Sequence, residues 1–535
     1  MDKTLLSKTA RLSYFILRLD RIRIPLWLFG LTFFTIIVPI AFDELYGSDS
    51  AGETAGLAET MANPAMTAMV GPGNLDDYTI GAMTAHQMLL MTAVIVGLMA
   101  ILLVARHTRA DEEDGRLEMI RSFPVGRLSY LNATLLVITG TSVLLALING
   151  FGLYALGIES MNLEGSMLYG ASLGATLLFF AGITAIFAQL SQSSRGTIGL
   201  SISFLLLAYL VRGMTDVSNE ALSWISPLGW VTKAEVYWNN NWWPILLLTI
   251  GSFLLFILAN FFNAIRDLES GFFAARPGRK YASLFLQSPL ALSLRLQRTG
   301  IIAWGIGMFV LGASYGSVLG DLEAFISDNE LYSQLLVQAE GVSITEQFLP
   351  MLIIVMTLIG VIPPIMAINK LRAEEKKGRL EHLLSRAVSR TELIGGYLLI
   401  SVVNGFVMVL LGALGLWSAG NAVMDEGIRF GTIFSAMMAY YPAILVMIGV
   451  AVVLIGFVPR WTNIIWLYVF YSFIVIYFGG LFQFPDWVGK LSPFGHVAQA
   501  PVEEVTLRPL FFLSIIAVAL IASGMIGYKK RDLES

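Results

Sequence analysis

The chain has 535 residues, of which 56% are hydrophobic and only 13% are charged, and its mean hydropathy is +0.72. Soluble proteins carry roughly a quarter charged residues, so this composition excludes an ordinary soluble enzyme and a disordered chain. With 34 Lys and Arg against 38 Asp and Glu, the net charge of −4 lacks the basic excess of a nucleic-acid-binding protein, and the absence of Cys excludes disulfides and thiolate metal sites.

The N-terminal residues 3–24 alternate apolar and basic side chains at helical spacing. This pattern is typical of a helix that lies in the membrane interface; an ordinary basic flank of a first transmembrane helix is the alternative. Apolar runs of roughly 20 residues follow and predict about twelve transmembrane helices, because backbone polar groups in lipid must be satisfied within a helix. The runs lie near 24–42, 79–105, 128–157, 166–190, 197–212 and 244–263, and near 300–319, 349–368, 391–416, 432–458, 462–482 and 509–528.

Lys and Arg are distributed unevenly over the loops between these runs. If the N-terminus is cytoplasmic, the segments on that side hold 29 of the 34 Lys and Arg, and the outer segments hold 5. Cytoplasmic loops carry the excess of basic residues in membrane proteins. We therefore predict a multi-pass protein of the cell membrane whose N- and C-termini are both cytoplasmic.

The two halves of the chain repeat each other at charged and turn positions. Four motif pairs recur in one order: RLDR (18–21) and RLQR (295–298), GRLE (115–118) and GRLE (378–381), SPLGW (226–230) and SPFGH (492–496), RDLES (266–270) and RDLES (531–535). An even number of helices in each half makes the halves parallel, related by an axis along the membrane normal. We predict an all-α polytopic membrane protein with a first six-helix half over 1–265, a cytoplasmic linker and connecting helix over 266–299, and a second six-helix half over 300–535.

The inner loop after the second helix of each half, at 106–127 and 370–390, is duplicated and dense in charges of both signs. Each copy begins with acidic residues, continues as GRLE and an apolar turn, and ends in VGR or VSR. Leucines at helical spacing predict a short amphipathic helix with exposed leucines that docks into a groove of a partner protein. The alternative is a solvated, salt-bridged loop that only enforces the topology. We favour docking, because topology requires neither the acidic run nor the repeated order of GRLE.

The SPxG motifs before the sixth and twelfth helices predict a short re-entrant or interfacial helix on the outer side. Pro cannot donate a backbone hydrogen bond, and Gly permits a tight turn. The candidate residues for an outer gate are Pro227, Gly229, Pro493 and Gly495. A structural lid is the alternative.

The eleventh apolar run is rich in aromatic residues, which could line the path of a bulky apolar solute. The candidates for this substrate path are Trp466, Phe470, Phe473 and Tyr477. Aromatic residues that pack between helices or face lipid are the commoner explanation.

The sequence lacks the P-loop motif of ATP-binding proteins and the histidine motif of zinc proteases. No G-x-x-x-x-G-K-[ST] loop occurs, so the chain does not bind ATP by that route. The H-E-x-x-H motif of zinc proteases is absent as well, and the 4 His are far apart in sequence. We expect a transport subunit without catalytic residues, a metal site or a cofactor of its own.

Together these features resemble the permease subunits of type-2 ABC exporters. Those permeases have an interfacial connecting helix before helix 1, a coupling helix between helices 2 and 3, and a re-entrant outer segment before helix 6. The stretches EEDGRLEMIRSFPVGR and EEKKGRLEHLLSRAVSR look like that coupling region twice over. A fused chain with NPAMTAMVGPGN (63–74) in its first outer loop is similar to the polyketide-antibiotic exporter branch, named for tetronasin resistance. The resemblance covers nearly the whole chain.

The resemblance implies a separate ATP-binding subunit, two copies per chain, that holds ATP and Mg²⁺ and binds under the coupling regions. The cargo would be an amphiphilic or hydrophobic compound such as an antibiotic, a drug or a lipid, moved outward across the bilayer. The implied contact residues are Glu112, Glu113, Gly115, Arg116, Leu117, Glu118 and Arg127 in the first half and Glu374, Glu375, Gly378, Arg379, Leu380, Glu381 and Arg390 in the second. The copies differ at Asp114 and Lys377 and at Pro124 and Ala387, which leaves open whether the two ATP-binding subunits are identical.

Three other functions remain as alternatives. A secondary transporter of the major facilitator class also has two parallel six-helix halves, but its loop after helix 2 has the order G-x-x-x-D-[RK]-x-G-[RK], which 106–127 lacks. A membrane sensor or scaffold is not separated from a permease by the sequence. A membrane-embedded enzyme would need paired catalytic residues at membrane depth, and the sequence shows none.

Overall fold

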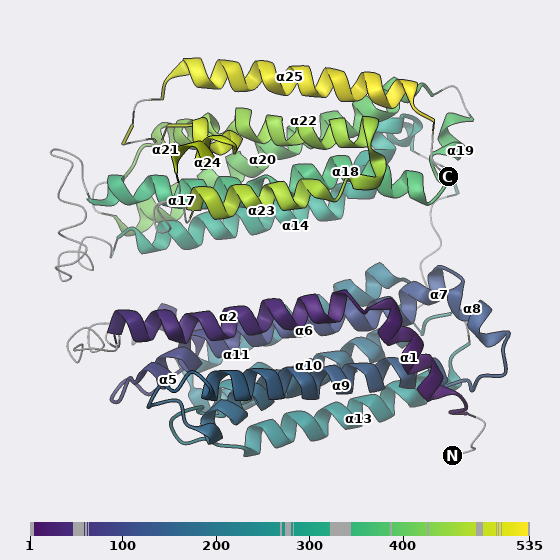
Figure 1. Cartoon of the computed structure of the whole chain (residues 1–535), viewed down its shortest axis with the longest axis vertical. Helices are drawn as coiled ribbons and strands as arrows, with labels where there is room; N and C mark the ends of the chain where they lie inside the picture. Colours follow the sequence, from purple (N-terminus) through teal and green to yellow (C-terminus); the bar gives the residue numbers. More distant parts are fainter. Residues whose placement is uncertain are drawn as a thin grey trace. The chain divides into compact units, whose positions relative to one another are not determined.

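The computed structural model describes residues 5–46, 58, 61, 64–267, 270–272, 280–281, 283–320, 344–385, 388–424, 427–477, 485–498, 500, 502–503 and 505–532. Within these ranges every regular element is a helix (Figure 1). The helices form two compact units, Met1–Gly278 and Arg279–Ser535, each with its own hydrophobic core.

Eleven helices of the described residues are long and apolar enough to cross a membrane, which confirms an all-α polytopic membrane protein. The sequence predicts about twelve by the length criterion. The expected run 462–482 contains α23 (Ile464–Tyr477), which is apolar but has only 14 residues. The rest of that run, from residue 478, lies outside the described residues.

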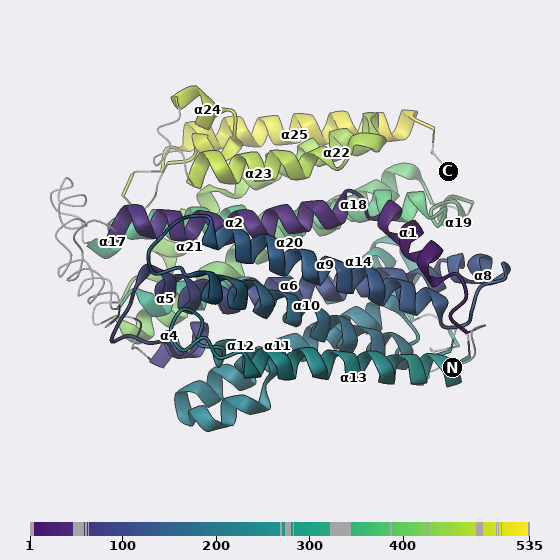
Figure 2. The same ribbon diagram turned by 60° about the horizontal axis from the view of Figure 1, so that its bottom comes forward.

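The first unit places its spans in the order that the apolar runs predict (Figures 1 and 2). Its second span is one helical stretch, Ile80–Glu113. That stretch consists of α5 (Ile80–Thr84), the π-helix η1 (Ala85–Leu89), α6 (Leu90–Ala105), the π-helix η2 (Arg106–Ala110) and α7 (Asp111–Glu113). The other helices are α1 (Thr9–Leu19), α2 (Arg23–Tyr46), α4 (Pro64–Val70), α8 (Arg116–Arg121), α9 (Ser129–Tyr154), α10 (Leu163–Leu190), α11 (Ser194–Ser218), η3 (Glu220–Ile225), α12 (Pro227–Thr232) and α13 (Trp243–Ile265).

The second unit repeats this order with local differences. Its helices are η4 (Leu284–Gln287), α14 (Pro289–Val318), α17 (Ile344–Gly360), α18 (Ile362–Lys376), α19 (Glu381–Leu384), α20 (Arg390–Val423), α21 (Phe430–Ala439), α22 (Tyr441–Phe457), η5 (Pro459–Trp461), α23, α24 (Asp486–Lys490), η6 (Pro493–His496) and α25 (Leu507–Lys530). The second span is interrupted at Val361, because Pro363 and Pro364 stand in the first turn of α18.

The amphipathic N-terminal helix and the first span are separate helices in the first unit, whereas one helix covers both positions in the second. In the first unit α1 ends at Leu19, and the carboxylate of the next residue, Asp20, is buried against His107 and Arg106. In the second unit Gln297 takes the place of that aspartate, and α14 runs through as one helix of 30 residues. A separate connecting helix is thus a feature of the first unit alone within the described residues.

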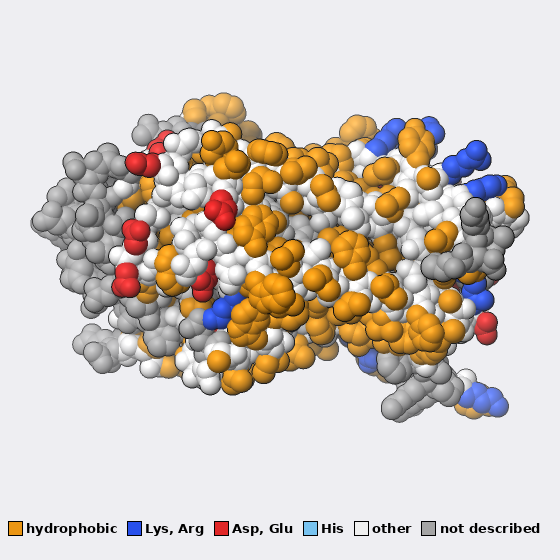
Figure 3. Space-filling model, turned by 90° about the horizontal axis from the view of Figure 1, so that it is seen from below, with side chains coloured by type: hydrophobic (Ala, Val, Ile, Leu, Met, Phe, Trp, Pro, Cys, Tyr) orange, Lys and Arg blue, Asp and Glu red, His pale blue; other side chains and the backbone are white. Residues whose placement is uncertain are grey.

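Exposed side chains separate by type along the helices. On the face drawn in Figure 3 hydrophobic side chains form a broad band, most of the visible Lys and Arg gather at one end, and Asp and Glu gather near the other. Large apolar residues such as Phe29 and Leu254 are more than half exposed. A soluble protein rarely exposes so much contiguous apolar surface, whereas lipid covers it in a membrane.

Glycines bring the long helices of each unit into backbone contact. A Cβ built at Gly170 on α10 would overlap the carbonyl oxygen of Ala146 on α9, and one built at Gly415 on α20 would overlap that of Phe309 on α14. Small residues at membrane helix interfaces allow such close approach. The helix pairs α9–α10 and α14–α20 therefore depend on residues without a side chain.

Each SPxG motif starts a short helix, α12 in the first unit and the 3-10 helix η6 in the second. The hydroxyls of Ser226 and Ser492 accept hydrogen bonds from the backbone two residues on, and Pro occupies the first turn of α12 and of η6. A Cβ at Gly229 would overlap the carbonyl oxygen of Ser223, and one at Gly495 that of Gly489. The glycine of the motif is needed because the preceding turn packs directly on it.

Replacing Gly170 by Ala tests the close packing of α9 on α10. The added methyl group would force the helices apart, and overpacking of this kind costs about 1–3 kcal/mol. Gly140 on α9 is the matched control, because nothing lies within 4 Å of a Cβ built there. We expect G170A to lower the thermal unfolding midpoint of the detergent-solubilised protein and G140A to leave it unchanged or raise it slightly. Equal midpoints would contradict the packing.

Candidate functional site

A glycine in the left-handed conformation shapes the charged loop after the second span of each unit. In the first unit the chain turns at Gly115 (φ 71°) from α7 into α8. In the second unit it turns at Gly378 (φ 66°) from α18 towards α19. Nothing lies within 4 Å of a Cβ built at either position, so the backbone angle rather than crowding requires glycine. The Gly of GRLE therefore ends the helix and starts the loop.

In the first unit an acidic residue of this loop is buried between two arginines. Glu112 forms a bidentate pair with Arg266, with Oε1 3.0 Å from Nη1 and Oε2 2.8 Å from Nη2. Arg109 Nη1 lies 2.9 Å from the same carboxylate. Arg266 follows directly on α13 and opens the first RDLES motif. The carboxylate thus joins the loop to the end of the sixth span.

The second unit repeats this arrangement with the residues at the matching positions. Glu375 pairs with Arg531 through Oε1 to Nη1 at 2.7 Å and Oε2 to Nη2 at 2.6 Å, and Arg372 Nη1 lies 3.2 Å from Oε1. Arg531 opens the second RDLES motif and follows directly on α25. We call each trio the Glu–Arg clamp. The sequence shows the RDLES repeat but not its role, so Arg266 and Arg531 are absent from the predicted contact residues.

The last arginine of each loop holds the same helix end. Arg127 Nη2 donates to the carbonyl oxygen of Arg266 at 2.8 Å, and Arg390 Nη1 donates to that of Arg531 at 2.6 Å. The last carbonyl groups of a helix have no partner within it, and basic side chains can satisfy them. The loop is therefore attached to the sixth span both at its start and at its end.

The arginine of GRLE turns back to the first acidic position of its loop. Arg116 Nη1 lies 2.8 Å from Asp111 Oδ1, and Arg379 Nη1 lies 3.1 Å from Glu374 Oε2. The hydrogen bond and the charge of Asp111 raise the pKa of Arg116 above its usual value. Each of these ion pairs joins the residues before the glycine to the residue after it and so stabilises the turn.

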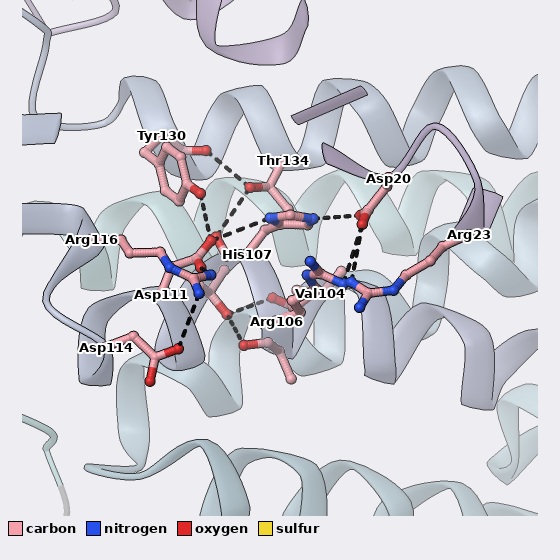
Figure 4. A network of polar contacts seen from close by, with 12 residues as sticks. Asp20, Arg23, Val104, Arg106, His107, Asp111, Asp114, Arg116, Tyr130 and Thr134 are labelled. Atoms are coloured by element: carbon pink, nitrogen blue, oxygen red, sulfur yellow. Dashed lines mark hydrogen bonds and ion pairs between the residues drawn. The ribbon is translucent and has the colours of Figure 1, made fainter. Parts of the chain in front are cut away.

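A further buried network, drawn in Figure 4, belongs to the first unit alone within the described residues. His107 lies between two carboxylates, with Nε2 2.5 Å from Asp20 Oδ2 and Nδ1 3.3 Å from Asp111 Oδ2. Tyr130 donates its hydroxyl to Asp111 at 2.6 Å. The second unit has Lys370 at the histidine position, 3.0 Å from Glu374. The sequence predicts isolated histidines; the structure instead places His107 in this network.

The exposed side chains of the two loops differ from those that the sequence predicts. Leu117 is 7% exposed and Leu380 is 2% exposed, so these leucines anchor the loops and do not dock. The exposed positions include Glu113, Asp114, Arg116, Glu118, Met119 and Phe123 in the first unit and Lys377, Arg379, Glu381 and His382 in the second. In a helix of four to six residues, helical spacing does not determine which side is buried, so the prediction of exposed leucines at 117 and 380 is wrong.

The candidate path and gate residues lie on other elements. Trp466, Phe470, Phe473 and Tyr477 are all on α23, where Phe470 is 63% exposed and the rings of Phe473 and Tyr477 stack with centroids 5.5 Å apart. The hydroxyls of Tyr468 and Tyr471 on the same helix donate to the carbonyl oxygens of Leu491 and Val488, just before the second SPxG motif. The structure thus joins α23 to Pro493 and Gly495, whereas Pro227 and Gly229 belong to the first unit.

The comparisons with known proteins identify the family. The model of the multidrug efflux system permease Rv1217c, C-terminal domain, matches residues 13–262 and 286–529. The chain belongs to this permease family. It is 34% identical over 523 residues to the multidrug efflux system permease protein Rv1217c of Mycobacterium tuberculosis (strain ATCC 25618 / H37Rv), which covers 97% of this chain and 94% of that protein. The two matched segments correspond to the two repeats, and each contains one charged loop of the Rv1217c-like permease.

The part that the structure describes contains no group of three or more His, Cys, Asp or Glu side chains suited to hold a metal ion. The carboxylates around His107 and in the Glu–Arg clamps face arginines, which compete for the same oxygen atoms. The chemistry of the permease loops is therefore that of ion pairs.

Glu112→Gln tests the clamp of the first unit. The substitution removes the carboxylate that pairs with the buried side chains of Arg109 and Arg266, and breaking a buried pair costs about 3–5 kcal/mol. We expect E112Q and R266Q each to lower the thermal unfolding midpoint, with the double variant losing less than the sum of the two. E118Q, at an exposed position, is the matched control and should leave the midpoint unchanged. Additive losses in the double variant would mean that the two side chains do not interact.

Proposed function

We propose that this chain is the membrane-spanning permease of an ABC-type efflux pump. In this proposal a separate ATP-binding subunit, two copies per chain, holds ATP and Mg²⁺ and binds the two charged loops from the cytoplasm. Its closure on ATP moves the helices and drives an amphiphilic or hydrophobic compound outward. The observation that carries the proposal is the duplicated loop, fixed by a Glu–Arg clamp to the sixth span of its own unit.

A loop that is to receive force must be joined rigidly to the helices that are to move. The loop of the first unit continues directly from the second span, leads into α9 and is tied to α13 through Glu112 and Arg127. The loop of the second unit is tied to α25 in the same way through Glu375 and Arg390. A push on α8 or α19 would therefore reach three spans of its unit at once.

The outward face of α8 offers a contact of mixed character. Met119 is 69% exposed and Phe123 is 63% exposed, beside the exposed carboxylate of Glu118. Large exposed apolar side chains at the tip of a short helix suit insertion into a groove of another protein. In the second unit Glu381 occupies the place of Glu118, whereas Met119 is replaced by the polar His382. The two contacts would share a glutamate and differ in their apolar part.

The name of the Mycobacterium tuberculosis relative supports efflux of several drugs and a system with more than one component. The loops would face the cytoplasm, because 29 of the 34 Lys and Arg then lie on that side. Membership of the polyketide-antibiotic branch named for tetronasin resistance remains part of this proposal and rests on the resemblance of the first outer loop.

The proposal predicts a stoichiometric partner. Affinity capture of the solubilised chain from its native membrane, with ATP present, should recover a protein with a P-loop ATPase motif, as measured by mass spectrometry. Reproducible recovery of the chain without any such ATPase, under mild detergent conditions, would contradict the proposal and favour a secondary transporter or a sensor.

Replacing Glu118 and Glu381 together by Ala tests the contact itself. Both side chains are exposed, so we expect an unchanged thermal midpoint together with loss of the ATPase from the complex or loss of drug-stimulated ATP turnover. E164A is the matched control, because Glu164 is an exposed glutamate in the first turn of α10. This variant should keep the ATPase in the complex and the drug-stimulated ATP turnover. Wild-type complex recovery with wild-type stimulated turnover in E118A/E381A would refute the assignment. The two single variants show whether the loops are equivalent.

A further inference from the structure

The first unit contains a cavity of about 380 Å³, a size within the range of small-molecule sites. Its lining comes from three segments, 70–74, 82–90 and 232–238. The cavity lies at the start of the helical stretch Ile80–Glu113, whose other end leads into the charged loop. Figure 2 shows α4, α5 and α12 at one end of this unit and α8 at the other. The cavity is therefore remote from the proposed ATPase contact.

Unusual backbone conformations gather around this cavity. The π-helix η1, which forms part of the wall, is of a type that is rare and frequently marks functional sites. In the loop after α12, Glu235 and Tyr237 have left-handed backbone angles, with φ 48° and 64°. Such angles are uncommon for residues of this kind and cluster at ligand-binding sites. Two segments around the cavity thus hold conformations that the surrounding structure must enforce.

Hydrogen bonds fix the segment 71–74 onto the π-helix. His86 Nε2 donates to the carbonyl oxygen of Gly71 at 2.8 Å, and the Tyr78 hydroxyl donates to Nδ1 at 2.9 Å. Burial raises the pKa of Tyr78 to about 12, so the hydroxyl keeps its proton near neutral pH. A Cβ built at Gly73 would lie only 2.6 Å from the His86 ring, so only glycine lets the segment lie this close.

A fully buried ion pair fixes the neighbouring helix α4. Arg212 Nη1 lies 2.8 Å from Asp216 Oδ2, and both side chains are 0% exposed. Arg212 Nη2 also donates to the carbonyl oxygen of Ala68 at 2.5 Å. Val70, the last residue of α4, lines the cavity. These contacts make the cavity a preorganised part of the fold.

The lining combines an apolar wall with a carboxylate, an indole ring, the His86 ring and the side chain of Lys233. Ala85, Leu89 and Leu90 supply apolar surface from the π-helix and the residue after it. Glu235 Oε2 accepts a hydrogen bond from Asn239 at 2.7 Å; within the described residues the other carboxylate oxygen accepts none. Trp238 is 51% exposed. A carboxylate beside an exposed indole attracts a cation, through charge and through the face of the ring.

We propose that this cavity binds an amphiphilic organic cation, with its apolar body against η1 and its positive group between Glu235 and Trp238. Binding of the cation does not depend on the proposed function. That the bound cation is the transported substrate rests on the proposed function. The second repeat does not reproduce the site, because VAQAPVEEVTLRP follows its SPxGH where VTKAEVYWNNNWWP follows SPLGW in the first. Binding therefore belongs to the first half.

Two probes of the same shape and opposite charge test the site: tetraphenylphosphonium and tetraphenylborate. The purified full-length chain in detergent is dialysed to equilibrium against each ion, without any ATP-binding subunit. We expect saturable binding of the phosphonium, about tenfold tighter than that of the borate, and a further loss of about tenfold in E235Q. E164Q is the matched control, since Glu164 is an exposed carboxylate at the first turn of α10 and does not line the cavity.

A second readout needs no variant. Carbodiimide labelling read by mass spectrometry should show that the phosphonium shields Glu235 and leaves Glu164 reactive. Equal affinity for the two ions, an unchanged phosphonium affinity in E235Q, or no shielding of Glu235 would each overturn the proposal. Tighter binding of the borate would also overturn it and would assign the site to Lys233, which lines the same cavity. Because no ATP-binding subunit is present, any of these failures leaves the proposed ATPase coupling intact.

Discussion

A carboxylate that is buried away from water must be paired with a positive charge. In the two Glu–Arg clamps this requirement attaches each charged loop to the end of a membrane span. Removing a charge from water costs several kcal/mol, and a buried pair is often no more stabilising than apolar residues of the same volume. A leucine at Glu112 and a methionine at Arg266 could in principle fill the same space. The ion pair instead fixes the position of the loop relative to the end of α13, because a bidentate pair defines both the distance and the direction between the carboxylate and the guanidinium group. The same clamp at Glu375 and Arg531 shows that both halves use this position for the same joint.

Both halves have the Glu–Arg clamp, but the residues next to it differ. The repeat therefore conserves the attachment of the loop, while the surroundings of each loop are its own. In the first unit Asp20 directly follows α1, pairs with His107 and attaches α1 to the loop. In the second unit Gln297 and Lys370 replace both partners, and α14 runs on without a break. A transport cycle that used two identical contacts would not need this difference. The charge network of Figure 4 ties the first loop to Asp20 at the end of α1, and the second loop has Lys370 and Glu374 at the corresponding positions.

The sequence predicts the elements of this fold better than the contacts between them. Apolar runs locate the spans because backbone N–H and C=O groups in lipid must form their hydrogen bonds within one helix. This constraint acts on neighbouring residues, so a pattern of neighbouring residues reveals it. The GRLE and RDLES repeats point to the loops and to the ends of the sixth spans. Nothing local says that Glu112 meets Arg266, which is 154 residues away. Arg212 is another case, since a charge near a helix end suggests solvent, yet its partner Asp216 and the carbonyl groups of α4 bury it completely.

One helical stretch connects the cavity of the first unit with its charged loop. Ile80–Glu113 has 34 residues, which corresponds to roughly 50 Å at 1.5 Å per residue. Its first end carries the π-helix η1 and the cavity, and its last end carries the π-helix η2, His107 and the clamp. The regular part of this stretch, α6, passes a tilt at one end to the other. The wide π turns are the points where its register can change, and His107 already departs from helical angles there, with φ −88° and ψ 16°. A displacement of α8 is therefore also a displacement of the cavity wall unless one of these two turns absorbs it.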